Sequence, residues 1–158
     1  MNADIKQFWD LNRMYTPLRD ELMASLSDDD LNFTPGGENP TLGALCRELG
    51  ETQHAYAQSF KSFKVDFSYR VNDDAYLTSV EKLKAWYATL DQELEAALEA
   101  VSDEDVANKT MDRGGYEVPL HIGLDILREA LLIFYGKVSV YLKAMGMERT
   151  QMWRDWIA

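Results

Sequence analysis

Apolar residues recur at helical spacing along most of this chain. The clearest stripe lies in the third predicted helix, and its members are Val80, Leu83, Trp86, Tyr87, Leu90, Leu94, Leu98 and Val101. Residues three and four positions apart share one face of an α-helix, so this stripe predicts a helix that buries one side. Because this periodicity dominates the chain, we expect an all-α fold.

The first helical stripe is interrupted by a proline. Its apolar members are Ile5, Phe8, Trp9, Leu11, Leu18, Leu22 and Leu26. Pro17 removes one backbone hydrogen-bond donor and its ring clashes with the preceding turn. We therefore expect this helix to be kinked or divided near residue 17.

Capping residues predict where the second and third helices begin. Asn39 can cap the second helix, and Pro40 fits its first turn. Thr78 and Glu81 form a capping-box pattern at the start of the third helix. The stretch between these helices, residues 65–77, is interpreted as an ordered loop.

The fourth predicted helix is apolar on most sides. It is expected to begin at Pro119 and to end at Gly146. Such a pattern is typical of the most buried helix of a bundle. The apolar members are Ile133, Phe134, Tyr135, Val138, Tyr141 and Leu142.

Two connections are long enough to cross over the bundle. The second of them, residues 102–118, contains Gly114 and Gly115, which could form the turn of a small hairpin. We therefore expect a four-helix bundle as one domain, residues 1–158, with crossover loops. Its C-terminal tail carries Trp153, Trp156 and Ile157, which should pack on the bundle or at a subunit interface.

The net charge narrows the range of partners. At −11, the chain would be repelled by nucleic acid and by anionic membrane surfaces, so neither is an expected partner. No apolar stretch reaches the roughly 18 residues that cross a bilayer. The first residues lack the pattern of a signal peptide, and the single cysteine, Cys46, fits a reducing compartment. We therefore expect a cytoplasmic protein.

Three segments resemble the DinB/YfiT-type four-helix-bundle superfamily. They are Asn39-Pro40-Thr41-Leu42-Gly43-Ala44-Leu45, the stretch from Gly136 to Gly146, and the first connection from Leu26 to Pro35. The order and spacing of these segments extend the resemblance over nearly the whole chain. The resemblance implies a DinB-like bundle and makes a homodimer the expected assembly.

The resemblance also implies where a metal would bind. Many members hold a divalent metal with three histidines, and the matching positions here are Glu48, Ala130 and Phe134. Alanine and phenylalanine offer no donor atom, and one carboxylate cannot hold a transition metal tightly. We therefore expect a degenerate metal site, no metal and no cofactor.

Glu48, Ala130, Phe134 and Lys137 are the predicted lining of a ligand pocket. Lys137 lies about 700° around the helix from Ala130, close to two full turns, so these two residues should share a face. One hypothesis is that Glu48 and Lys137 form an ion pair in the space left by the metal. The alternative is that the Lys137 side chain extends to the surface.

Two classes of function remain open. The first is a non-metal-binding bundle that binds a small ligand or forms a homodimer. The second is an enzyme. The resemblance to this superfamily of metal-dependent hydrolases implies activities such as metal-dependent thiol transfer, and these need the metal. A metal-free acid–base enzyme could use Glu48 with Lys137, Tyr135 or Tyr141.

Two other patterns have less specific interpretations. Glu51 and His54 match the Glu-x-x-His spacing of di-iron bundles, but no second copy of the motif occurs. His54 and His121 are therefore expected to make ordinary hydrogen bonds. Cys46 is expected to be a buried structural thiol.

Overall fold

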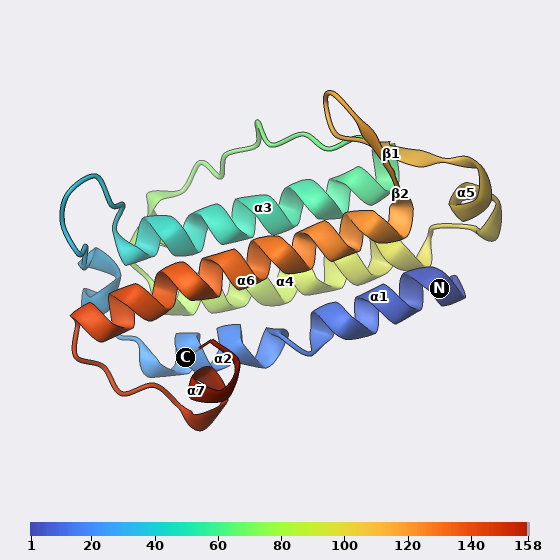
Figure 1. Cartoon of the computed structure of the whole chain (residues 1–158). Helices are drawn as coiled ribbons and strands as arrows, with labels where there is room; N and C mark the ends of the chain where they lie inside the picture. Colours follow the sequence, from blue (N-terminus) through green and yellow to red (C-terminus); the bar gives the residue numbers. More distant parts are fainter. Residues whose placement is uncertain (158) are drawn as a thin grey trace.

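A computed structural model describes residues 1–157, and its long helices pack side by side along their lengths (Figure 1). The first helical segment consists of α1 (Ala3–Arg13) and α2 (Thr16–Ser25). The other three are α3 (Leu42–Ser62), α4 (Val80–Glu99) and α6 (Leu120–Ala144). α3 packs against both α4 and α6, and α6 packs against α1. The predicted all-α four-helix bundle is confirmed.

The first helix is divided where the proline predicted it. α1 ends at Arg13, α2 begins at Thr16, and Pro17 lies in the first turn of α2. At the break, the backbone carbonyl of Tyr15 accepts a hydrogen bond from the amide of Leu18 at 3.2 Å and a second one from the hydroxyl of Tyr135 on α6 at 2.9 Å. The divided helix is therefore held to α6 at its break.

Two predicted helix caps are wrong by one or two positions. Thr41, not Asn39, caps α3, and Ser79, not Thr78, caps α4. The side chain of Asn39 instead donates a hydrogen bond to the carbonyl of Gly36 in the preceding turn, at 2.7 Å. Thr78 closes the short helix that precedes α4. Both residues make their hydrogen bonds within the preceding connection and do not cap the following helix.

The predicted start and end of the fourth helix, α6, are confirmed. α6 begins directly after Pro119, and Gly146 follows its last residues with a φ of +70°. In this left-handed conformation the amide of Met147 reaches back to the carbonyl of Leu142 at 2.9 Å. Glycine adopts that conformation at little cost, which explains why the helix ends there.

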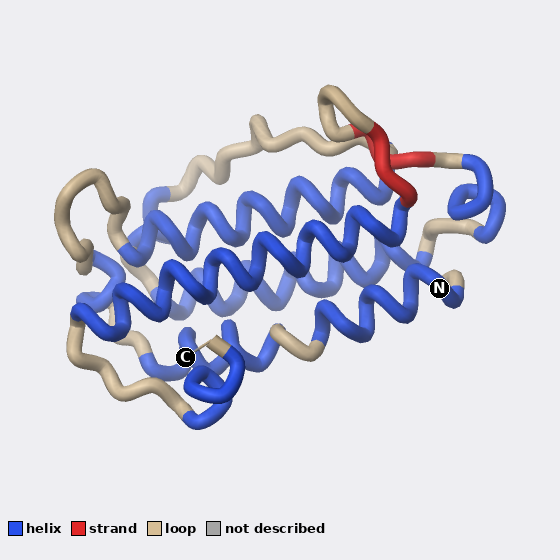
Figure 2. Tube along the Cα trace, viewed as in Figure 1, coloured by secondary structure: helices blue, strands red, loops and turns tan. Residues whose placement is uncertain are grey.

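Short elements fill the connections between the long helices (Figure 2). The predicted hairpin around Gly114 and Gly115 is present as two antiparallel strands. A short helix before it was not predicted, although Ser102 and Asp105 form a capping box at its start. The short elements are η1 (Asp29–Asn32), η2 (Asp74–Leu77), α5 (Asp103–Asn108), β1 (Thr110–Asp112), β2 (Glu117–Pro119) and α7 (Gln151–Trp156).

The long loop before η2 lies along α3. The amide of Val71 donates a hydrogen bond to the buried carboxylate of Glu51 at 3.1 Å. The ring of Tyr69 stacks on His54, with the ring centroids 4.0 Å apart. These contacts attach the predicted loop to α3, whereas the last residues of the predicted range, Asp74–Leu77, form η2.

Two apolar residues expected inside the bundle lie at its surface. Ile133 on α6 is 61% exposed and Leu11 on α1 is 36% exposed. Val140 on α6, for which no position was predicted, is 57% exposed. The expectation that α6 is buried on most sides is therefore wrong. An apolar residue on an outward face carries the same sequence signal as a buried one, so the pattern could not separate them.

The C-terminal tail packs on the bundle through Trp153. This side chain is 2% exposed, and its indole donates a hydrogen bond to the carbonyl of Leu18 on α2 at 3.0 Å. Trp156 is half-exposed and contacts the ring of Tyr15 edge-on. Within residues 1–157, no helix combines the length and the apolar character needed to cross a membrane.

Candidate functional site

The groove between α3 and α6 brings together every residue of the predicted ligand pocket. It encloses about 180 Å³. Helical spacing explains the convergence, because residues three, four and seven positions apart share one face of each helix. From α3 it is lined by Leu45, Glu48, Leu49 and Thr52, and from α6 by Ala130, Ile133, Phe134 and Lys137.

The groove has an apolar floor and a charged rim. Leu45, Leu49 and Phe134 are buried and form the floor. Glu48 on α3 and Lys137 on α6 are both exposed. The arrangement suits a ligand with an apolar body and polar ends, which is the usual composition of a small-molecule site.

The hypothesis of a Glu48–Lys137 ion pair is wrong. Among residues 1–157, no ion pair within 4.0 Å joins their charged atoms, and both side chains face solvent. Ala130, from which the position of Lys137 was inferred, lies half-buried at the rim rather than inside the bundle. A lysine two turns along the same face therefore also reaches the rim, where its charge is hydrated at little cost.

The donor atoms of this groove do not fit a metal. Ala130 and Phe134 offer none, and Glu48 is the one carboxylate in the lining. In the described part of the chain, no three or more histidine, cysteine, aspartate or glutamate side chains lie close enough to share an ion. Structural and catalytic zinc sites need at least three such ligands.

A second cavity of about 170 Å³ adjoins the groove. The two cavities share Glu48 and Thr52. The second one adds Phe67 and Arg70 from the long loop, and the Arg70 side chain is mostly exposed. Sequence reasoning missed these two residues because helical periodicity cannot place a loop.

Comparison with known proteins identifies the family of this bundle. Residues 17–129 match the family model of the DinB superfamily. The chain belongs to the DinB superfamily. Its fold is similar to the crystal structure of the DinB-like protein YjoA from Bacillus subtilis, with a TM-score of 0.66 and 19% identity over 95% of this chain and 94% of that chain. No match was found among curated proteins.

In this DinB superfamily member, the candidate catalytic residue Tyr141 lies apart from the groove lining. Its hydroxyl donates a hydrogen bond to the carbonyl of Pro40 at 2.8 Å, and its ring packs edge-on against Phe33. Burial raises the pKa of Tyr141. The structure therefore does not bring Tyr141 together with Glu48 and Lys137, and its observed contact holds the start of α3 to α6.

Cys46 on α3 is a poor nucleophile in this fold. It is fully buried, and burial raises the pKa of its thiol to about 12. The reactive form of cysteine is the thiolate, which this environment disfavours at neutral pH.

Glu51 and His54 contact the long loop and attach it to α3. The carboxylate of Glu51 lies 3.7 Å from the guanidinium of Arg47 and 3.6 Å from that of Arg70, besides accepting the Val71 amide. The stacking of His54 on the loop adds to this attachment. These contacts account for both side chains without a di-iron site.

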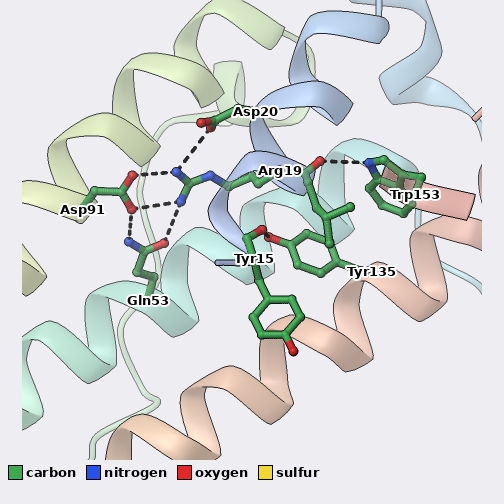
Figure 3. Close-up of polar contacts among 8 residues, drawn as sticks. Tyr15, Arg19, Asp20, Gln53, Asp91, Tyr135 and Trp153 are labelled. Carbon is green, nitrogen blue, oxygen red and sulfur yellow. Dashed lines mark hydrogen bonds and ion pairs between the residues drawn. The ribbon is translucent and has the colours of Figure 1, made fainter. Parts of the chain in front are cut away.

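A buried arginine joins three helices away from the groove (Figure 3). Arg19 on α2 donates hydrogen bonds to Asp91 on α4 at 3.0 and 2.6 Å and to Gln53 on α3 at 3.2 Å. Gln53 in turn donates to Asp91 at 2.6 Å. The guanidinium also lies 4.8 Å from the centre of the Tyr87 ring.

The electrostatics of this cluster favour the charged arginine. Burial by itself lowers the pKa of Arg19, but the hydrogen bonds and the negative charge of Asp91 outweigh it, so the net shift is upward. Sequence analysis missed Arg19. The available signal was its position one turn after Tyr15 and one turn before Met23, within the apolar stripe of α2.

Proposed function

We propose that this member of the DinB superfamily binds a small organic molecule in the groove between α3 and α6, without a metal. The observation that carries the proposal is the groove itself, with its apolar floor and one charge of each sign on its rim. Its lining includes all three positions at which the superfamily resemblance places histidine ligands. In this chain those positions supply a carboxylate, a methyl group and an aromatic ring.

The charges on the rim indicate the class of ligand. The ammonium group of Lys137 would attract a carboxylate or sulfonate, and Glu48 would accept a hydrogen bond from a donor on the same molecule. The apolar body would lie over Leu49 and Phe134. The two adjoining cavities together reach the roughly 300 Å³ that marks the lower end of ligand pockets.

Binding fits the groove better than catalysis does. A general base needs a neighbour that orients it near the proton it removes. Glu48 makes no hydrogen bond or ion pair to any other residue among 1–157. Metal-dependent thiol transfer or hydrolysis would need donor atoms that the lining does not supply.

Titration with 8-anilinonaphthalene-1-sulfonate tests the proposal, because this fluorescent probe has an apolar body and one sulfonate. We expect saturable binding of one probe per chain. Lys137→Glu should weaken binding at least tenfold, because a carboxylate would then face the sulfonate. Lys61→Glu makes the same change of charge near the end of α3 and should leave the affinity within twofold. Equal affinities of the two variants, or no saturable binding, would overturn the proposal.

A further inference from the structure

A cavity of about 300 Å³ lies at the break of the first helical segment, between this segment and α4. We call it the outer cavity. Its volume reaches the lower end of the range for small-molecule sites. None of its lining residues, all within 1–157, belongs to the groove between α3 and α6. It is lined by Trp9 and Arg13 from α1, by Thr16, Pro17 and Asp20 from α2, and by Asp91, Gln92 and Glu95 from α4.

A smaller inner cavity of about 20 Å³ adjoins the outer cavity. The two cavities share Trp9, Thr16 and Asp91. The inner cavity is also lined by Asn12 and by the buried Arg19 of the three-helix cluster (Figure 3). Apolar side chains of α4 and α6 form much of the remaining wall. The volume is enough for one water molecule or for one chemical group of that size.

Two buried polar atoms in the lining of the inner cavity lack a hydrogen-bond partner among residues 1–157. They are Oδ1 of Asn12 and Nε of Arg19, and the two residues are only 3% and 4% exposed. The orientation of the Asn12 amide is fixed, because its Nδ2 donates hydrogen bonds to the carbonyl oxygens of Phe8 at 2.9 Å and Leu124 at 3.0 Å. The inner cavity therefore offers one acceptor and one donor. Buried polar atoms are nearly always paired, so each of these is expected to bind a further group.

A hydroxyl is the group that satisfies both atoms. It can donate a hydrogen bond to Oδ1 of Asn12 and accept one from Nε of Arg19. A carboxylate could only accept, and it would lie beside the negative charge of Asp91. An ammonium group could only donate, and it would lie beside the positive charge of Arg19. Hydrogen-bonding capacity and charge therefore both favour a neutral hydroxyl.

The outer cavity offers hydrogen-bonding groups for further hydroxyls. The hydroxyl of Thr16 and the side-chain amide of Gln92 make no hydrogen bond within residues 1–157. The exposed carboxylate of Asp20 lies 3.5 Å from the guanidinium of Arg19 and can accept other hydrogen bonds. Trp9 adds an apolar wall against which carbon atoms can pack. This composition suits a molecule that carries several hydroxyls on a carbon skeleton.

We propose that the outer cavity binds a neutral polyhydroxylated molecule, such as a monosaccharide or a cyclitol. One hydroxyl of this ligand enters the inner cavity and joins Nε of Arg19 to Oδ1 of Asn12. The site is separate from the groove between α3 and α6, and it does not depend on the function proposed for that groove.

NMR titration of the full chain, labelled with nitrogen-15, tests the proposal. The ligands are D-glucose, D-galactose, D-mannose and myo-inositol, each added separately. The indole of Trp9 donates a hydrogen bond to Glu95 in the lining, at 3.4 Å, so its N–H signal reports on the outer cavity. We expect this signal to shift saturably with at least one of the four ligands. The indole signal of Trp86, which packs against Gly50 on α3, should not shift. No saturable shift with any of the four would overturn the proposal.

Two substitutions test the contacts. Thr16→Val removes the hydroxyl that lines both cavities, keeps the shape of the side chain and should weaken binding at least threefold. Asn12→Leu removes the buried acceptor and should weaken binding at least tenfold. Thr89→Val, on the exposed side of α4, is the matched control and should leave binding unchanged. Unchanged binding in Thr16→Val would overturn the proposal, and this result decides even if Asn12→Leu does not fold.

The two proposed sites can be tested independently. Lys137→Glu, which should weaken binding of the fluorescent sulfonate, should leave binding of the sugar or cyclitol unchanged, because Lys137 does not line the outer or the inner cavity. Thr16→Val should leave binding of the sulfonate unchanged, because Thr16 does not line the groove. Loss of sugar binding in Lys137→Glu would place the sugar in the groove and overturn the proposal.

Discussion

The carboxylate of Asp91 on α4 accepts two hydrogen bonds from the guanidinium of Arg19 on α2, at 3.0 and 2.6 Å. Both guanidinium NH2 groups are satisfied in this way, and the amide of Gln53 on α3 joins the same cluster. One buried cation thus connects three of the long helices. The charge of Arg19 is balanced mainly by Asp91, because Asp20, the other carboxylate that pairs with it among residues 1–157, is 3.5 Å away and exposed.

Asp91→Ala should therefore destabilise the protein strongly. The substitution leaves a buried cation without its main partner, and breaking such a pair costs about 3 kcal/mol or more. The free energy of unfolding, measured by urea denaturation, should fall by that amount. Asp10→Ala is the control, because Asp10 pairs with Lys6 on the surface of α1 and both side chains are mostly exposed. Its cost should stay below about 1 kcal/mol. Equal costs for the two variants would contradict this account of Arg19.

Trp153→Ala should cost far more stability than Trp156→Ala. The Trp153 side chain fills a buried position against α2, and truncating a buried aromatic residue costs about 3–5 kcal/mol. Trp156 is 50% exposed, so its truncation should cost less than about 1 kcal/mol. Thermal unfolding of the two variants measures the difference. Similar melting temperatures would mean that the tail does not stabilise the bundle.

Gly43→Ala should destabilise the start of α3. An added Cβ would lie 1.9 Å from the backbone carbonyl oxygen of Leu77, which cannot move without shifting η2. Overpacking of this kind costs about 1–3 kcal/mol. Gly115→Ala is the matched control, since its added Cβ would meet nothing within 4 Å. Chemical denaturation of both proteins checks the prediction, and a neutral Gly43→Ala would contradict the close approach of η2 to α3.

The sequence predicted the long helices well, because each buries one face and apolar residues therefore recur at helical spacing along its whole length. It predicted their first residues less well. Several adjacent polar residues could cap each helix, and some of them make hydrogen bonds within the preceding connection instead. Asn39 and Thr78 could both cap a helix, but each bonds within the preceding connection. Only the position of the neighbouring turn decides between such candidates.

The sequence predicted which residues of α3 and α6 line the candidate site, but not how deeply each of them is buried. The spacing of Ala130, Phe134 and Lys137 placed them on one side of α6, and the structure places all three in one groove. Spacing does not say how far that side lies from solvent, so the sequence left open whether Lys137 lies inside the bundle or reaches the surface; in the structure it lies on the rim. Arg70 and Phe67 could not be found from sequence, because the path of the loop follows from its contacts with Glu51 and His54.

Glu51→Ala should release the long loop from α3. The substitution removes the acceptor of the Val71 amide and the charge beside Arg70. Hydrogen exchange of peptides covering residues 66–73 should become at least tenfold faster, because local opening no longer breaks these contacts. Glu51→Gln keeps an oxygen for the Val71 amide and should give an intermediate rate. Unchanged exchange in Glu51→Ala would mean that aromatic stacking alone holds the loop.

The burial of Cys46 should make stability depend on pH in alkaline solution. In the unfolded chain the thiol ionises near its ordinary value of 9.0, whereas burial raises the folded pKa to about 12. Above about pH 9 the unfolded state therefore binds fewer protons than the folded state, and the free energy of unfolding falls as pH rises. The slope from this one group approaches about 1.4 kcal/mol per pH unit at most.

Cys46→Ala isolates this contribution. The buried hydroxyls of Tyr87 and Tyr135 also have raised pKa values, and they lower stability in the same direction in both proteins. The difference in the free energy of unfolding between wild type and Cys46→Ala should therefore be constant below about pH 8 and should shift against the wild type by about 1 kcal/mol as the pH approaches 10. Urea denaturation across this range measures it. A difference that stays constant to pH 10 would mean that the thiol ionises equally easily in the folded and unfolded states, which is incompatible with its position between α3 and α4.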